Sequence, residues 1–287
     1  LDGARKLDMN EAIGRLLLTL GHIEASQGQL VSAEQTLSAC VKLAGEQQDA
    51  VFGPLCKLNW RLVRKLQGED AGSEADYKMA VAKLKSVETP LTAGMALSKT
   101  ADLYAKSGRM KRAFRLLGQA GQQYSKANSV PAMARNKLQQ ARFLQQDGRW
   151  AQARSKLNGL VDKFRQMGSK PALVQTLGLL GNDAGHQGKW GIAHKYYAQA
   201  ERVARETGSP QLIAKSRLAL CNLSSNAPKL VGADTCRQAA TTFETLGMPL
   251  LEAKSGAALA RGKQAAGEVK EVRKAFLDAT ELRDEKV

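Results

Sequence analysis

The feature that most constrains the fold of this chain is a pattern that returns every 40 residues. Residues 148–153 read Gly-Arg-Trp-Ala-Gln-Ala, and residues 188–193 read Gly-Lys-Trp-Gly-Ile-Ala. Steps of 40 residues in both directions reach Gly28, Gly68, Gly108, Gly148 and Gly188. Such a fixed period is the signature of a repeat array, in which each unit packs on its neighbours. We therefore expect a stack of similar units.

The residue types favour helices within each unit. Leu and Ala dominate the apolar residues, while β-branched residues are sparse and aromatic residues make up only 5%. Gly accepts the left-handed conformation that ends a helix, and a following Pro prevents continuation. Helix pairs are expected over 9–27 and 30–47, 51–67 and 73–87, 91–107 and 110–127, 130–147 and 150–167, 172–187 and 190–207, 211–223 and 230–246, and 250–265 and 268–283.

Small residues recur at fixed distances from each turn, where they let two helix backbones approach closely. Five residues after the turn stand Ala33, Ala113, Ala153, Ala193 and Ala233. Twelve after it stand Cys40, Ala80, Ala120, Ala200 and Ala240, with Leu160 as the exception. Seven before it stand Gly21, Ala101, Ala141, Gly181 and Cys221. A large residue such as Leu37 or Tyr197 lies between the positions five and twelve after the turn, and we expect it to fill the space beside the small residues.

This arrangement resembles the tetratricopeptide repeat, in the longer variety of MalT-type regulators and kinesin light chains. The resemblance implies an all-α, right-handed superhelix of about seven helix-turn-helix repeats, forming one domain over 1–287. The units would span 9–48, 49–89, 90–128, 129–168, 169–208, 209–247 and 248–287. It also implies a scaffold or adaptor for protein–protein interaction, with the helix before each turn lining a concave groove.

One face of these first helices contains the candidate binding residues. Positions six and thirteen before each turn share a face, because seven residues make nearly two helical turns. From the fourth unit onward these positions hold Arg135, Arg142, Gln175, Asn182, Lys215 and Asn222. Arg offers a forked set of hydrogen-bond donors and Lys a linear one, and none of these positions holds Asp or Glu. Such a face suits the binding of carboxylates. The pattern predicts a groove for an acidic peptide or an exposed C-terminus; a merely solvated polar face is the alternative.

The sequence contains no pattern typical of catalysis, a metal or a cofactor. His22, His186 and His194 lack partners at metal-ligand spacing, and no CxxC, HExxH or GxSxG motif occurs. The glycines before Lys189 superficially resemble a phosphate loop, but Trp190 stands where Ser or Thr is required, and the segment follows a helix. We therefore expect a non-enzymatic protein that needs no cofactor.

The charge leaves other partners open. Lys and Arg number 43 against 27 Asp and Glu, which gives a formal net charge of +16. Nucleic acid or another anionic surface is therefore an alternative partner, as is a small ligand if the chain is a regulatory sensor domain. No apolar run is long enough to span a membrane. The chain has no initiator Met and no signal peptide, so we expect either a processed product or a piece of a longer protein.

The four cysteines form two balanced pairs. Cys40 and Cys56 lie about equally far from the break near Gln48, and Cys221 and Cys236 flank the turn at 226–228. Residues equidistant from the turn of a helix hairpin lie at the same height, so each pair is placed for a disulfide. The alternative is four free cysteines acting as small core residues. Oxidised pairs would indicate an extracytoplasmic compartment, and free thiols would favour the cytoplasm.

Overall fold

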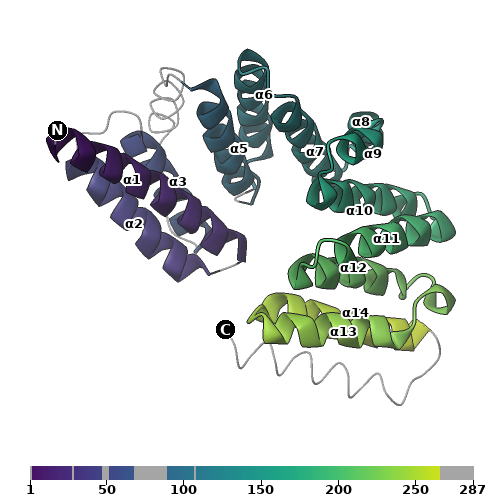
Figure 1. The fold of residues 1–287 in the computed structure, drawn as a ribbon. Helices are drawn as coiled ribbons and strands as arrows, with labels where there is room; N and C mark the ends of the chain where they lie inside the picture. The colour runs from purple at the N-terminus through teal and green to yellow at the C-terminus, as the bar shows by residue number, and fades with distance from the viewer. Residues whose placement is uncertain (1, 28, 47–51, 68–88, 107, 266–287) are drawn as a thin grey trace. The chain divides into compact units, whose positions relative to one another are not determined.

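The computed structural model describes residues 2–27, 29–46, 52–67, 89–106 and 108–265. Every regular element within these ranges is helical, as Figure 1 shows. The expected all-α helical-repeat fold is therefore confirmed. The expected helices 73–87 and 268–283, and the turns at Gly28 and Gly68, lie outside these ranges.

The chain divides into two compact units, Leu1–Asn136 and Lys137–Val287. The first contains α1 (Asp2–Gln27), α2 (Leu30–Glu46), α3 (Phe52–Leu66), α5 (Pro90–Lys106) and α6 (Met110–Lys126). Helix α7 (Val130–Gln146) crosses the boundary. The second continues with α8 (Trp150–Leu157), α9 (Leu160–Gln166), α10 (Lys170–His186), α11 (Trp190–Arg205), α12 (Pro210–Leu223), the 3₁₀ turn η1 (Pro228–Leu230), α13 (Ala233–Thr245) and α14 (Pro249–Ala265). Within each unit, helices that follow one another in the chain pack side by side.

The turn glycines end their helices as expected. Gly108, Gly148 and Gly188 have φ angles of 75°, 75° and 71°, in the left-handed region. At Gly188, the Lys189 amide donates to the Ala184 carbonyl at 2.9 Å, and the Gly188 amide donates to the Gly185 carbonyl at 2.9 Å. These two bonds satisfy carbonyls that the end of a helix leaves without partners. The repeat turns are therefore helix stops encoded by single residues.

The small residues lie where helices touch. Ala33, Ala113, Ala153 and Ala193 are completely buried. At the related position before the turn, a Cβ atom added to Gly181 would collide with the ring of Tyr197 on the next helix. The absent side chain of Gly181 therefore makes the space that the Tyr197 ring occupies.

The expected helix over 150–167 is wrong, because the structure breaks it into α8 and α9. Asn158 has φ −55° and ψ 128°, and Gly159 has φ 75° and ψ −6°. These angles are those of a type II turn, which requires glycine at its third residue. Leu160, the exception in the small-residue register, follows directly and is buried. The break lets this unit bury a Leu where other units place a small residue.

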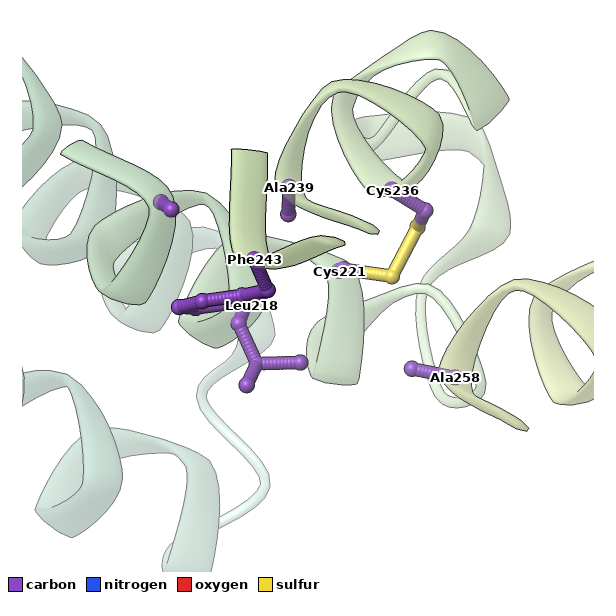
Figure 2. Close-up of a cluster of buried hydrophobic side chains, with 7 residues drawn as sticks. Leu218, Cys221, Cys236, Ala239, Phe243 and Ala258 are labelled. Atoms are coloured by element: carbon purple, nitrogen blue, oxygen red, sulfur yellow. A yellow bond between two sulfur atoms is a disulfide. The ribbon is translucent and has the colours of Figure 1, made fainter. Parts of the chain in front are cut away.

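The expected helix over 230–246 also begins too early. Pro228 and Lys229 lie in the 3₁₀ turn with Leu230, and the helix begins only at Ala233, after an extended Gly232. The later start changes the buried face, which consists of Cys236, Ala239 and Phe243, while Ala233 and Ala240 are half-buried. These three residues pack with Leu218, Cys221 and Ala258 from α12 and α14, as Figure 2 shows.

The structure joins the cysteines in the two pairs that their spacing suggests. The Cα atoms are 5.7 Å apart in Cys40–Cys56 and 5.2 Å apart in Cys221–Cys236. The first pair links α2 to α3, and the second links α12 to α13 inside the core of the second unit (Figure 2). Each bridge closes a short loop of a helix hairpin. The oxidised state of these cysteines in the protein stays a prediction.

Two glycines of α10 provide a matched test of the close contact. Gly181→Ala places a methyl group against the Tyr197 ring and should lower the free energy of unfolding by about 1–3 kcal/mol through overpacking. Gly178→Ala meets no atom within 4 Å, and should raise it by about 0.5–1 kcal/mol because Ala favours helix. Urea denaturation of both variants measures the difference. Equal effects in the two variants would contradict the packing argument.

The cysteine pairing can be tested directly. We expect peptide mapping without reductant to find the bridges Cys40–Cys56 and Cys221–Cys236. Reduction should lower the free energy of unfolding by about 2–4 kcal/mol for each bridge, because each bridge restricts the conformations of the unfolded chain. Recovery of four alkylated thiols from protein denatured without reductant, after isolation under conditions that prevent reduction, would show that the pairs are free.

Candidate binding face of the second unit

All six predicted binding residues are exposed. Five of them belong to the second unit, and Arg135 belongs to the first-unit part of α7. We call the five the polar face: Arg142 on α7, Gln175 and Asn182 on α10, and Lys215 and Asn222 on α12. Helices α10 and α12 contact each other directly. The first helices of consecutive repeats thus bring these residues to neighbouring positions.

A chain of hydrogen bonds holds the centre of the polar face. Gln145 is buried, and its Nε2 donates to the Leu179 carbonyl of α10 at 2.8 Å. Its Oε1 accepts from Asn182 Nδ2 at 3.5 Å, and Asn182 Oδ1 accepts from the Tyr197 hydroxyl at 2.7 Å. Burial raises the pKa of Tyr197 to about 12, which keeps this hydroxyl protonated at neutral pH. Asn182 is therefore a positioned amide.

The sequence alone did not indicate Gln145 or Tyr197 as parts of this network. Gln145 lies three residues after Arg142, on the side of α7 that turns inward, and was not recognised as polar support. Tyr197 was expected to fill space, and it does so with its ring against Gly181. Only the path of α11 across α10 shows that its hydroxyl also reaches Asn182.

The carboxylate of Asp183, the residue after Asn182, is neutralised by Arg154 of α8. Asp183 is buried and accepts from Arg154 Nε at 2.7 Å and from a second Arg154 nitrogen at 3.1 Å. Gln187 Nε2 also donates to this carboxylate, at 2.8 Å. The hydrogen bond and charge of Asp183 raise the pKa of Arg154. Asp183 therefore ties α8 to α10 and adds little negative charge to the neighbouring face.

Two further groups set the charge around α12. Glu201 accepts from Arg205 Nε at 2.7 Å and from Arg217 Nε at 3.1 Å, so this carboxylate is also paired. Partial desolvation lowers the pKa of Lys215, although its side chain is exposed. A nearby anion would reverse that effect by stabilising the charged ammonium. The polar face thus combines Arg142 and Lys215 with amides, and none of its five members is acidic.

In the first unit, the positions six before the turn hold His22 and Asp102, which are half-buried, and Leu62, which is buried. Of the positions thirteen before the turn, Arg15 and Met95 are exposed. Lys99 and Lys106 of α5 reach across to α1, where their Nζ atoms donate at 2.9 Å to Thr19 Oγ1 and to the Ala25 carbonyl. His22, whose Nε2 atom is fully buried, lies on α1 between the two residues that accept these bonds. Burial, followed by the charges of Lys99 and Lys106, lowers its pKa to about 3.

Other classes of site find little support in the described ranges. No three His, Cys, Asp or Glu side chains there come together in a way that would hold a metal ion. Among the helices of these ranges, none has the length and apolar character needed to cross a membrane. Trp150 stacks on His186 with ring centroids 4.1 Å apart, which joins the start of α8 to the end of α10. These aromatic residues therefore serve packing between repeats.

The comparisons with known proteins agree with the repeat architecture. No protein-family model and no curated protein matches the sequence. Similar solved structures include aspartyl phosphate phosphatase F from Bacillus subtilis, with a TM-score of 0.65, 12% identity, and coverage of 98% of this chain and 73% of that one. The apo form of RapI has a TM-score of 0.64 at 13% identity and covers 94% and 97%.

A third similar structure belongs to a STAND signal-transduction ATPase with a tetratricopeptide repeat sensor from Pyrococcus horikoshii. Its TM-score is 0.54 at 15% identity, and the match covers 91% of this chain but 41% of that one. At these identities the likeness establishes the fold. The chain therefore has the helical-repeat fold of these proteins, as its repeat pattern predicted.

The lowered pKa of His22 predicts that the folded chain loses stability in acid. His22 titrates near pH 3 when folded and near 6.5 when unfolded. Below pH 6.5 the unfolded chain takes up a proton that the folded chain does not, so the free energy of unfolding falls as pH falls. Between neutral pH and about pH 5 it should fall about 2 kcal/mol more in the natural chain than in His22→Gln. Urea denaturation at both pH values measures this difference; equal losses would contradict it.

Proposed function

We propose that this chain is a non-catalytic protein-interaction scaffold that binds an acidic segment of a partner protein on its polar face. The observation that carries the proposal is the presence of five exposed, non-acidic polar side chains at repeating positions of neighbouring helices. Solvated helix faces normally mix both signs of charge. Here Asp183 and Glu201, the nearby carboxylates, are each engaged by arginine side chains.

The chemistry of these side chains matches carboxylates. Arg142 offers a planar fork of donors, and Lys215 offers a compact ammonium. Gln175 and Asn222 add neutral donors, while Asn182 is already oriented by Gln145 and Tyr197. Bonds from charged donors to a carboxylate are about twice as strong as neutral ones. The face therefore favours Asp, Glu or a terminal carboxylate over neutral groups.

The repeat also sets the spacing of a suitable ligand. Two positions seven residues apart lie about 10 Å apart along a helix. Neighbouring helices pack roughly 8–10 Å apart, so the donors form a grid with similar spacing in both directions. An extended peptide advances about 3.3 Å per residue. Acidic residues about three positions apart would therefore meet successive donors.

The comparisons support a binding role without naming the partner. The STAND protein carries its tetratricopeptide repeats as a sensor, which is one use of this architecture. A nucleic-acid partner is the second candidate, favoured by the net charge of +16. Binding of nucleic acid would depend on many cations spread over the surface and would weaken steeply with salt. Binding of an acidic segment would depend on the polar face.

A charge-reversal experiment tests the proposed face. We expect Arg142→Glu with Lys215→Glu to weaken binding of a fluorescent acidic peptide about tenfold or more, because two donors become repulsive. The probe is a 15-residue peptide with Glu at every third position, and a version with Gln at those positions is the neutral reference. Fluorescence anisotropy at about 0.15 M salt gives both affinities.

The matched control reverses two exposed lysines on other helices, Lys156 of α8 and Lys195 of α11. Lys156→Glu with Lys195→Glu changes the net charge by the same amount. It should weaken binding by less than about threefold, because salt screens charges that lie far from the bound peptide. Circular dichroism checks that both variants stay folded. Equal loss in the two variants would locate binding in the overall charge and overturn the proposal; so would equal affinity for the acidic and neutral peptides.

A further inference from the structure

Helix α1 is apolar on two faces. One face packs inward, where Gly14, Leu18, Gly21 and Ala25 are buried. A Cβ atom added to Gly21 would lie 2.6 Å from Leu37 Cγ of α2, so this face is in close contact with α2. This contact accounts for the first set of apolar residues. The second set of apolar residues on α1 lies outside this contact and is exposed.

The second set forms a stripe along the outside of α1. We call it the α1 stripe, and it consists of Met9, Ile13, Leu16, Leu20 and Ile23, which are 41–69% exposed. Their spacings are four, three, four and three residues. Single exposed apolar residues are ordinary on a protein surface, but a contiguous exposed apolar patch typically marks a contact site. The α1 stripe is a patch of this kind.

The spacing indicates which kind of contact fits. Alternation of four and three residues is the seam along which two helices pack as a coiled coil. The stripe is nearly symmetric about Leu16, with Ile13 and Leu20 near it and Met9 and Ile23 seven residues away on either side. Two antiparallel copies centred on Leu16 would place each side chain opposite an apolar partner. A self-complementary patch of this kind is the requirement for a two-fold dimer.

The edges of the stripe also permit two copies to approach. The positions beside it on α1 hold Asn10, Ala12, Leu17, Thr19 and Glu24. Four of these are uncharged, and Lys99 reaches the edge through its bond to Thr19. None of these five positions holds a cation, and the cation shown to reach them is Lys99. Repulsion between two copies is correspondingly weak there.

The area is sufficient for a reversible dimer. Five large apolar side chains at these exposures present on the order of 500 Å², which is a large patch for a monomer. Two copies would bury about 1,000 Å², near the lower limit for a specific interface. We propose that two copies of this chain associate through antiparallel pairing of their α1 stripes. We expect a micromolar dissociation constant, because interfaces near this lower limit belong to weak and transient complexes.

Sedimentation equilibrium of the full chain tests the proposal. Between about 1 and 200 μM, the natural chain should pass from monomer to dimer and form no larger species. Leu16→Glu places a charge at the centre of the seam and should raise the dissociation constant at least tenfold. Ile13→Glu with Leu20→Glu is a second variant, which should abolish the dimer.

The control is Val31→Glu on α2, since Val31 is 65% exposed and Leu16 is 69% exposed. It should leave dimerisation unchanged, and circular dichroism should show all variants equally helical because these side chains are exposed. A natural chain that stays monomeric throughout the range would overturn the proposal. A dimer that survives both stripe variants, or that Val31→Glu disrupts equally, would place the interface elsewhere. A natural chain that forms a series of larger species would show non-specific association and also overturn it.

Discussion

The close approach of paired helices is the contact on which the rest of this structure depends. It exists because a residue with little or no side chain faces a large one, as Gly181 faces the Tyr197 ring and Gly21 faces Leu37. Interiors pack at crystal-like density, so neither a gap nor an extra methyl group is tolerated cheaply there. The completely buried alanines at positions 33, 113, 153 and 193 repeat this contact along the chain.

The same contact organises the proposed binding face. Because Tyr197 lies over Gly181, its hydroxyl reaches the neighbouring Asn182 and fixes that amide at the surface. Gly181 is buried and the next residue, Asn182, is exposed. The following repeat shows the same division at Cys221 and Asn222. Helix packing and the proposed binding face thus use adjacent residues of one turn. The Tyr197 hydroxyl links the packed contact at Gly181 to Asn182 through one hydrogen bond.

The two units use the same register differently. In the second unit, Asp183 is drawn away from the surface by Arg154, and the cations of the polar face remain exposed. In the first unit, Lys99 and Lys106 donate to α1 and enclose the His22 imidazole. The second unit therefore presents its polar-face positions to solvent, whereas two lysines of the first unit form hydrogen bonds within that unit. The first unit also exposes the apolar stripe of α1.

The sequence by itself determined the helical-repeat fold, most helix ends and the burial of the small residues, because these follow from local rules. A glycine that must adopt a positive φ, or an alanine between two helices, is recognisable from its spacing alone. The break at Asn158 and Gly159 was missed, since Gly159 falls outside the repeat register and its turn was read as helix interior. The delayed start of α13 was missed because the helix pattern was extended back through Pro228 and Gly232.

The tertiary structure decided how the candidate face is built. The sequence placed Arg142, Gln175, Asn182, Lys215 and Asn222 on one side of their helices, and the structure leaves all five exposed. It could not show that Asp183 meets Arg154, 29 residues away, or that Gln145 supports Asn182, 37 residues away. Such pairs depend on the distance and direction between helices rather than on the period within one helix. For that reason only the packed structure shows which carboxylates are neutralised by distant arginines and which polar side chains stay exposed.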